Sequence, residues 1–115
     1  MNGMHREATA AEYVEWLFSY ALSKGKQELL IRSGLTLPGA EQFSQDHEGA
    51  ALPPVEHVIN RLKVLSGLSP VRYTQEVRKV VKKTIRTVQL EADMAFQDKP
   101  EGSMVRIHIV FRGSL

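Results

Sequence analysis

The sequence predicts an α+β domain, in which α-helices come first and an antiparallel β-hairpin comes last. Two observations indicate this order: apolar residues recur every three to four positions over residues 55–66, and they alternate with polar residues from Thr87 onward. The chain has 115 residues, of which 43% are hydrophobic and 24% are charged. Because this length and composition are typical of one folded domain, we expect residues 1–115 to form a single domain.

A long helix is predicted near the N-terminus, after a loose leader over residues 1–8. Thr9-Ala10-Ala11-Glu12 matches a capping box, in which the threonine hydroxyl and the glutamate carboxylate each accept a backbone N–H at the start of a helix. We therefore expect a helix over 9–24 that ends near Gly25. Residues 26–32 are predicted to form a further short helical piece.

The middle of the chain, residues 33–54, is rich in glycine, proline and small polar residues. This composition predicts a long loop, with one turn of helix near 40–44. Asp46, His47 and Glu48 are residue types that bind metals, but in a loop such a cluster is more often solvated. No metal site is therefore predicted.

Two further helices are predicted over 55–66 and 70–84. The first ends before Gly67, which suits the left-handed position after a helix, and Ser69-Pro70 is a typical start for the next. The polar residues expected off the apolar stripe of the first helix are Glu56, Asn60 and Lys63. The apolar side of the second would consist of Tyr73, Val77, Val80, Val81 and Thr84. A strand would mix lysines and valines on both faces, so the helix is favoured.

The C-terminal segment is predicted to form a hairpin with strands at 87–97 and 103–112, because apolar residues occupy every second position of both. One register places these residues on a single face, which must then pack on the helices. It pairs Phe96 with Val105, Met94 with Ile107, Ala92 with Ile109 and Leu90 with Phe111. On the polar face, the pairs are Asp93 with His108 and Gln89 with Arg112.

Charge is distributed unevenly along the chain, although the net charge is only +2. Residues 1–58 contain four basic and eight acidic residues, a net of −4, whereas residues 59–115 contain eleven basic and five acidic residues, a net of +6. The second half therefore suits a polyanion or an acidic protein surface as its partner. The alternative is that the two halves attract each other and that their charged side chains only keep the surface of the domain solvated.

The segment 59–85 resembles a helix-turn-helix, because two predicted helices flank a short turn and the second has a cationic side. Followed by a hairpin, it resembles the order of a winged-helix domain, whose second helix enters the major groove of DNA. The resemblance implies a nucleic-acid-binding or regulatory domain. Arg72 and Gln75 would read base edges, and Lys79, Lys82, Lys83 and Arg86 would contact phosphates. The full predicted site is Arg72, Gln75, Arg78, Lys79, Lys82, Lys83 and Arg86.

The alternative function is a protein-interaction module that binds an acidic partner, extends another sheet through the outer strand of the hairpin, or forms a homodimer. We expect no enzymatic activity and no cofactor: the chain has no cysteine, and a facing Asp93 and His108 are more simply a cross-strand ion pair. No apolar run approaches the roughly 20 residues of a membrane span, so we expect no membrane partner. A cytoplasmic location is expected.

Overall fold

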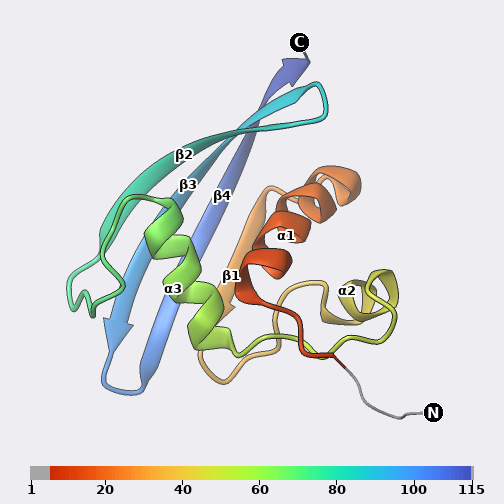
Figure 1. The fold of residues 1–115 in the computed structure, drawn as a ribbon. Helices are drawn as coiled ribbons and strands as arrows, with labels where there is room; N and C mark the ends of the chain where they lie inside the picture. The colour runs from red at the N-terminus through yellow and green to blue at the C-terminus, as the bar shows by residue number, and fades with distance from the viewer. Residues whose placement is uncertain (1–5, 115) are drawn as a thin grey trace.

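The structure, a computed structural model, describes residues 6–114, which form three helices and a four-stranded antiparallel sheet (Figure 1). In chain order the elements are α1 (Ala10–Lys24), β1 (Glu28–Arg32), α2 (Ala40–Asp46), α3 (Val55–Leu65), β2 (Val77–Ile85), β3 (Val88–Lys99) and β4 (Gly102–Ser114). The strand order across the sheet is β1-β4-β3-β2. The predicted α+β class is therefore confirmed.

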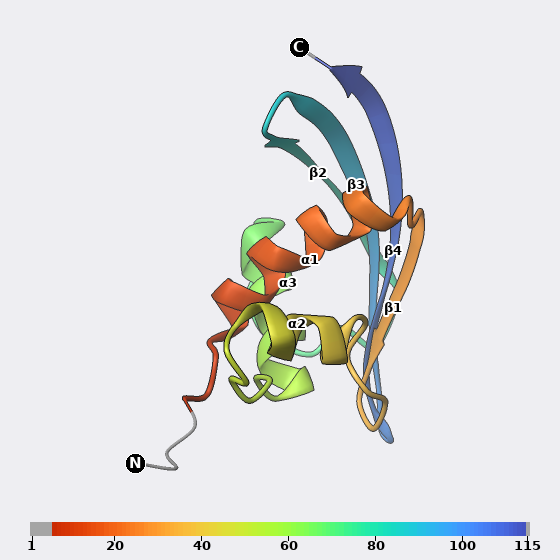
Figure 2. The same cartoon turned by 90° about the vertical axis from the view of Figure 1, so that its right-hand side faces the viewer.

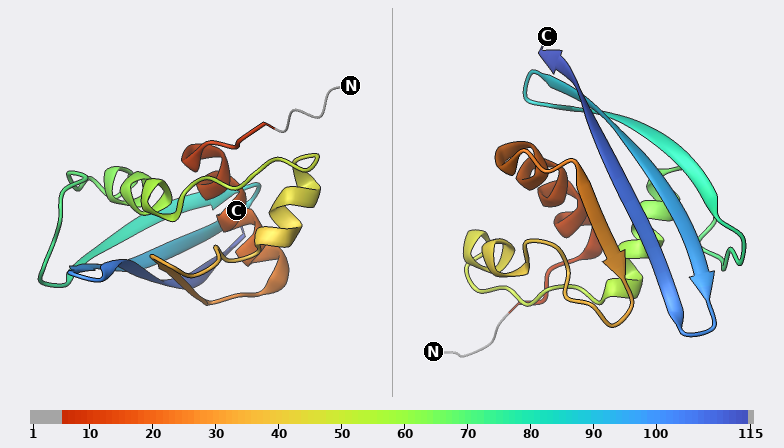
Figure 3. Two further views of the ribbon diagram at one scale, coloured as in Figure 1. Left: turned by 90° about the horizontal axis from the view of Figure 1, so that it is seen from below. Right: turned by 180° about the vertical axis from the view of Figure 1, so that it is seen from behind.

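The helices lie on one side of the sheet and leave its other face open (Figure 2, Figure 3). α1 and α3 pack on each other, and α3 also contacts β1 and β4. α2 packs on α1 through Phe43, whose ring centre lies 5.4 Å from that of Tyr13. The β2–β3 turn and the end of β4 extend beyond the helices (Figure 1, Figure 2). The sheet thus has one covered face, one open face and two edge strands, β1 and β2.

Two of the predicted helices are confirmed, together with their ends. Thr9 caps α1: its hydroxyl accepts the Glu12 N–H at 3.1 Å, and the Glu12 carboxylate accepts the Thr9 N–H at 3.0 Å. Gly25 follows α1 with a φ of 63°, and Gly67 lies just after α3 with a φ of 84°. These left-handed conformations favour glycine, so the ends of both helices follow from the local sequence.

The predicted hairpin is confirmed with its register. β3 and β4 pair Phe96 with Val105, Met94 with Ile107, Ala92 with Ile109 and Leu90 with Phe111. These side chains face the helices, and all but the half-buried Phe111 are buried. The pairing differs at one position, because the register shifts between Gln89 and Leu90. Gln89 therefore lies opposite Gly113 and not opposite Arg112.

Residues 28–32 form β1, so the short helical piece predicted over 26–32 is wrong. Leu29 and Ile31 are buried, whereas the residues between and beside them are exposed. This is the alternation of a strand, but five residues hold too few repeats to separate a period of two from one of 3.6. β1 pairs with β4 and covers an edge of the hairpin that would otherwise be unpaired, which favours the strand.

The helix predicted over 70–84 is also wrong, because residues 69–76 are irregular and residues 77–85 form β2. β2 is the antiparallel neighbour of β3, from Val77 opposite Phe96 to Ile85 opposite Val88. Five of its nine residues are β-branched, which favours a strand over a helix. The residues predicted as a helix-turn-helix therefore contain one helix and one strand, and the winged-helix order is not found among residues 6–114.

The predicted loop over 33–54 contains α2, close to the helical turn expected at 40–44. Of the predicted leader, residues 1–5 lie outside the described part of the chain. Residues 6–8 are held in place: the Ala8 N–H donates to the Ala51 carbonyl at 2.9 Å, and the Ala51 N–H donates to the Arg6 carbonyl at the same distance. The described part of the leader is therefore anchored on the loop and is not loose.

The core fills the space between the covered face of the sheet and the helices. Its largest fully buried side chains are Tyr13, Leu17, Phe18, Ile31, Phe43, Ile59, Leu62, Leu90, Met94, Phe96, Ile107 and Ile109. They come from α1, α2, α3, β1, β3 and β4. β2 contributes only half-buried residues to this core, so it lies at the margin of the packed layer.

A buried ion pair joins α3 to the end of β3. Lys63 and Asp98 are 3% and 2% exposed, and the Lys63 Nζ lies 2.9 Å from the Asp98 Oδ2. Lys63 also donates to the Val71 carbonyl at 2.7 Å, and Asp98 accepts the Tyr73 N–H at 2.6 Å. The pair therefore fixes the irregular segment 69–76, which leads into β2.

The stability of the fold is expected to decrease at acidic pH through Asp98. Burial raises the pKa of Asp98, but hydrogen bonds from Ser103, from the Tyr73 N–H and from Lys63 outweigh burial and bring the pKa below its usual value of 3.8. Because the unfolded chain binds this proton more readily, the contribution of the carboxylate is complete above about pH 5 and is lost as the pH falls through the folded-state pKa.

Urea denaturation from neutral to acidic pH would measure this effect as a decline in the free energy of unfolding. The variant Asp98→Asn should be less stable at neutral pH and should show a shallower decline. An equally steep decline in wild type and variant would contradict the assignment.

Candidate functional site

Three of the seven residues predicted to bind nucleic acid lie outside the strands. Arg72 and Gln75 belong to the irregular segment 69–76, and the Arg72 Nη2 donates to the Lys99 carbonyl at 2.8 Å. Arg86 lies in the β2–β3 turn, with a φ of 58°. Because none of the three is on a helix, the geometry on which the base-reading roles of Arg72 and Gln75 depended is not formed.

The other four predicted residues lie on β2, and together we call them the basic edge: Arg78, Lys79, Lys82 and Lys83. Successive residues of a strand point to opposite faces of the sheet. Lys79 and Lys83 are opposite buried residues of β3 and face the helices, whereas Arg78 and Lys82 are on the open face. The row of cations predicted along one side of a helix is therefore divided between two faces.

β2 is the outermost strand of the sheet, as Figure 1 shows, and no strand among residues 6–114 pairs with its outer side. In such an edge strand, alternate backbone N–H and C=O groups point away from the sheet and lack partners within it. The nine residues of β2 include four basic residues and no acidic residue. The basic edge thus combines available backbone groups with an unbalanced positive charge.

The two cations on the open face differ in their surroundings. Arg78 lies 3.4 Å from a carboxylate oxygen of Glu76 and 3.7 Å from one of Asp93. Within the described ranges, Lys82 has no carboxylate within 4.0 Å. Between them lies Val80, which is 57% exposed and is the most exposed large apolar side chain among the described residues. An apolar contact point is thus flanked by two basic side chains.

The two cations on the covered side also differ. The Lys83 Nζ lies 3.2 Å from a carboxylate oxygen of Glu15 on α1 and 5.7 Å from the centre of the Phe18 ring. Lys79 is exposed and, as far as residues 6–114 are concerned, has no carboxylate within 4.0 Å. Each face of the basic edge therefore holds one cation with an ion-pair partner in the chain and one without.

Beyond β2, ion pairs balance much of the charge on the open face. Arg106 lies 2.8 Å from Glu76, and Arg112 lies 3.0 Å from Glu91. The hydrogen bond from Arg112 lowers the pKa of Glu91, and Glu91 in turn raises the pKa of Arg112. Carboxylates are therefore distributed across this face, whereas β2 has none.

Asp93 and His108 lie opposite each other, as predicted, but the charged or polar group nearest to each belongs to another residue. The His108 Nδ1 lies 2.8 Å from a Glu28 carboxylate oxygen, and Asp93 faces Arg78. The contact of Glu28 with His108 was not predicted, because it requires residues 28–32 to form a strand beside β4 and not a helix. Among the described residues, the cross-strand ion pair expected between Asp93 and His108 is therefore not formed, and the two residues do not form an acid–base dyad.

The metal-binding residue types near the end of α2 have other partners. Asp46 accepts hydrogen bonds from the Trp16 Nε1 at 2.9 Å and the Gln42 Nε2 at 2.8 Å, and these bonds lower its pKa. The His47 ring stacks on Phe43 with ring centres 4.0 Å apart. In the part of the chain that the structure describes, no group of three or more potential metal ligands is found.

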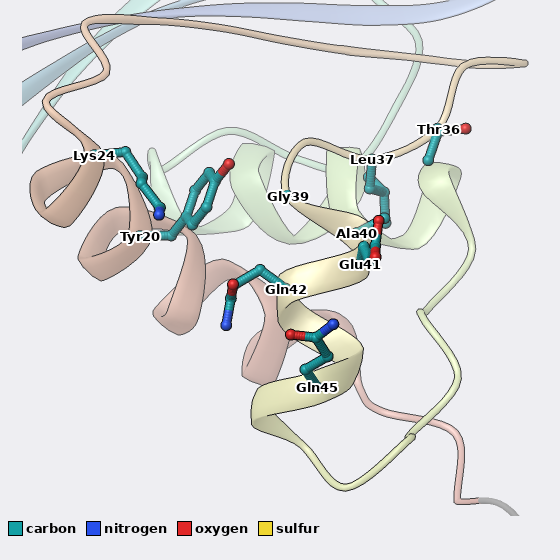
Figure 4. Close-up of a pocket in the computed structure, with 9 residues that line it drawn as sticks. All are labelled: Tyr20, Lys24, Thr36, Leu37, Gly39, Ala40, Glu41, Gln42 and Gln45. Atoms are coloured by element: carbon teal, nitrogen blue, oxygen red, sulfur yellow. The ribbon is translucent and has the colours of Figure 1, made fainter.

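A recess of about 430 Å³ lies between α1 and α2 (Figure 4). Lys24 lies beside the Tyr20 ring, and Gln42 and Gln45 project from α2 (Figure 4). Only two of its nine lining residues are charged, Lys24 and Glu41, and their charges balance. The recess therefore lacks the unbalanced charge of the basic edge.

Comparisons with protein-family models, with characterised proteins and with solved structures find no significant match to this chain. No helix among residues 6–114 is both long enough and apolar enough to span a lipid bilayer. The properties of the basic edge are therefore the basis for a functional proposal.

Val80 was expected on the buried apolar side of a helix, but it is exposed on the open face of β2. The signal that could have located it is the composition of residues 77–85, where five of nine are β-branched. Such residues favour strands, and a strand that alternates lysine with valine on both faces is typical of an exposed edge.

Proposed function

We propose that the protein is a small, non-catalytic binding module whose basic edge engages an acidic segment of a partner protein. The observation that carries this proposal is an edge strand with four cations, no acidic residue and no neighbour on its outer side among residues 6–114. An available strand edge can pair with another chain, and lysines along it disfavour strands without the opposite charge, because pairing would remove the ammonium groups from water or bring like charges together.

The distribution of the cations favours an extended polypeptide over a nucleic-acid duplex. A duplex on the open face would meet Arg78 and Lys82, but it would not reach Lys79 and Lys83 on the other side. Beyond β2, the cations of the open face, such as Arg106 and Arg112, are already paired with carboxylates, so a duplex there would find few free cations to bind its phosphates. An extended chain along the margin of the sheet reaches both rows of cations and can also bond the available backbone groups.

A second copy of this chain is not favoured as the partner at this edge. Antiparallel pairing of β2 with its own copy would bring two positively charged strands together, and like charges on neighbouring strands are destabilising. A partner of the opposite charge removes this repulsion. An acidic partner protein is therefore favoured over a second copy of this chain as the ligand of the basic edge.

Fluorescence anisotropy would test the proposal with two labelled probes, an oligoglutamate peptide and a short DNA duplex, at low and at physiological salt. We expect the peptide to bind more tightly than the duplex. The double variant Lys79→Glu/Lys82→Glu should weaken peptide binding at least about tenfold, because it reverses one unpaired cation on each face. The matched control is Lys26→Glu/Arg61→Glu, which makes the same change in net charge at exposed sites outside β2.

Each outcome of this experiment distinguishes between functions. Tighter binding of the duplex, lost in Lys79→Glu/Lys82→Glu, would replace the protein partner with nucleic acid. Equal weakening in both double variants would assign the binding to net charge and not to the basic edge. No binding of either probe at low salt would overturn the proposal.

A further inference from the structure

The sequence of the basic edge has an internal pattern that describes its partner more closely. From Arg78 to Lys83, the strand reads two basic residues, two valines and two basic residues. Because side chains alternate, each face of β2 presents the same order, basic, valine, basic. The open face has Arg78, Val80 and Lys82, and the covered side has Lys79, Val81 and Lys83.

We propose that the partner adds to the sheet as a fifth strand beside β2, through a segment of two acidic, two apolar and two acidic residues centred on Val80 and Val81. This inference rests on the proposed function, because it takes the acidic partner as given and specifies its sequence and its mode of binding. The pattern reads the same in both directions, so the required segment is the same for a parallel and an antiparallel strand.

The apolar centre is the part of this pattern that charge alone does not explain. Val80 is 57% exposed, and its cross-strand neighbour on β3 is Asp93, which gives it little apolar cover. An apolar residue on an added strand would lie directly beside Val80 and remove its surface from water. Val81 is half-buried against the core, so a second apolar residue there would extend the packed layer outward.

The basic residues at both ends of the β2 pattern would pair with the acidic residues of the added strand. The four cations are expected to contribute unequally to the affinity. Neither Lys79 nor Lys82 has a carboxylate within 4.0 Å among the described residues, but Lys82 is opposite Glu91 on β3 whereas Lys79 is opposite Met94, so an acidic partner residue gains most at Lys79 and next at Lys82. The contacts of Arg78 with Glu76 and Asp93, at 3.4 and 3.7 Å, are long and exposed, so Arg78 can accept a further carboxylate. Lys83 already pairs with Glu15, so the acidic residue opposite Lys83 should matter least.

Backbone pairing makes a requirement that general electrostatic attraction does not. A strand bonds its neighbour on one side through alternate peptide groups, while the other groups point away. The amides of the partner segment form two alternating sets, one facing β2 and one facing away. N-methylation of the set that faces β2 should therefore abolish binding, and N-methylation of the other set should leave binding intact. Attraction between unstructured charges would be affected equally by both sets.

The test compares two labelled peptides of identical composition, Glu-Glu-Val-Val-Glu-Glu and Glu-Val-Glu-Glu-Val-Glu, with the same neutral flanks, by fluorescence anisotropy. We expect the first to bind about tenfold more tightly, because the cross-strand pairs with the cations and with the two valines are correctly placed only in that order. Val80→Thr should weaken the first peptide about threefold and leave the second unchanged. The matched control is Val71→Thr, at an exposed valine outside the strands.

The outcomes separate this inference from the proposed function. Equal affinity of the two peptides, or equal effects of the two N-methylated sets, would overturn strand addition; the acidic partner would stand if Lys79→Glu/Lys82→Glu still weakened both. If neither peptide bound at low salt, the inference would be overturned. If oligoglutamate also failed to bind, the proposed function would be overturned as well.

Discussion

Replacing Lys63 with methionine is expected to lower the free energy of unfolding by about 3–5 kcal/mol, because the change leaves the Asp98 carboxylate buried without its counter-charge. Both residues are almost completely shielded from water, so solvent cannot compensate. Methionine keeps most of the aliphatic volume of lysine, so a packing defect accounts for little of the loss. Urea denaturation at neutral pH, followed by the fluorescence of Trp16, would measure it.

The control is the double variant Lys63→Met/Asp98→Asn. Asparagine retains an oxygen that can accept the Tyr73 N–H and removes the unpaired charge, so the double variant should regain part of the stability lost in Lys63→Met. If the loss of unfolding free energy in the double variant equalled the sum of the losses in Lys63→Met and Asp98→Asn, the two residues would not be coupled. That result would contradict this account.

The change Gly39→Ala is expected to cost about 3 kcal/mol, from two sources. Gly39 has a φ of 66°, where a residue with a side chain is strained by roughly 1–2 kcal/mol. A Cβ at this position would also lie 2.7 Å from the Trp16 Cη2 and 2.9 Å from the Tyr20 Cζ. Trp16 cannot move away easily because its Nε1 is bonded to Asp46, and overpacking of this kind costs about 1–3 kcal/mol.

The matched control is Gly49→Ala, because Gly49 has a φ of 79° but no atom within 4 Å of the added Cβ. This variant should lose only the backbone contribution, about 1–2 kcal/mol. Urea denaturation gives both values, and near-UV circular dichroism should change only in Gly39→Ala, since Trp16 and Tyr20 stack with ring centres 4.7 Å apart. Equal losses in the two variants would contradict a clash with the rings.

The predictions that succeeded rest on patterns that are complete within one segment. The capping box at Thr9 and the glycine after each of two helices fix the ends of α1 and α3 through hydrogen bonds and backbone conformations that are local. The register of β3 and β4 also follows from the sequence, because a shift by one residue would turn every apolar side chain of the hairpin toward water.

The prediction for residues 70–84 failed because lysine was treated as a residue that must avoid the covered face. At the margin of a sheet this rule is weak, since the aliphatic part of a lysine can lie along the surface while its ammonium group reaches water or a carboxylate. Lys83 does so, with Glu15 as its partner. Lys79 lies on the same side and remains exposed.

Lys63 is a second lysine whose position was predicted wrongly, because it is buried although a surface position was expected. It was expected off the apolar stripe of its helix, yet it is four residues after the buried Ile59 and therefore on the same side of α3. That spacing indicates a buried position, and a buried cation requires a counter-charge. The counter-charge, Asp98, is 35 residues away in the chain, and no local pattern identifies it.

For the candidate site, the sequence was sufficient to find the cations but not to arrange them. All four residues of the basic edge were among the predicted contacts, because their charge is evident from composition alone. Their division between two faces depends on whether residues 77–85 coil or extend, and that depends on the hydrogen bonds that β3 offers to a neighbour. The change from a helix to an edge strand replaces the duplex nucleic acid with an extended acidic chain as the favoured partner.

The amino-acid sequence by itself determined the α+β class, the ends of α1 and α3, the hairpin register and the excess of positive charge in the second half. Each of these depends on interactions between residues that are near in the chain or on simple counting. Only the tertiary structure decided that β1 and β2 lie at the two edges of the sheet, that Lys63 and Asp98 meet, and that the cations lie along an available edge. Segments with mixed patterns adopt the conformation that satisfies the backbone groups and charges of distant neighbours, and those neighbours are known only once the chain has folded.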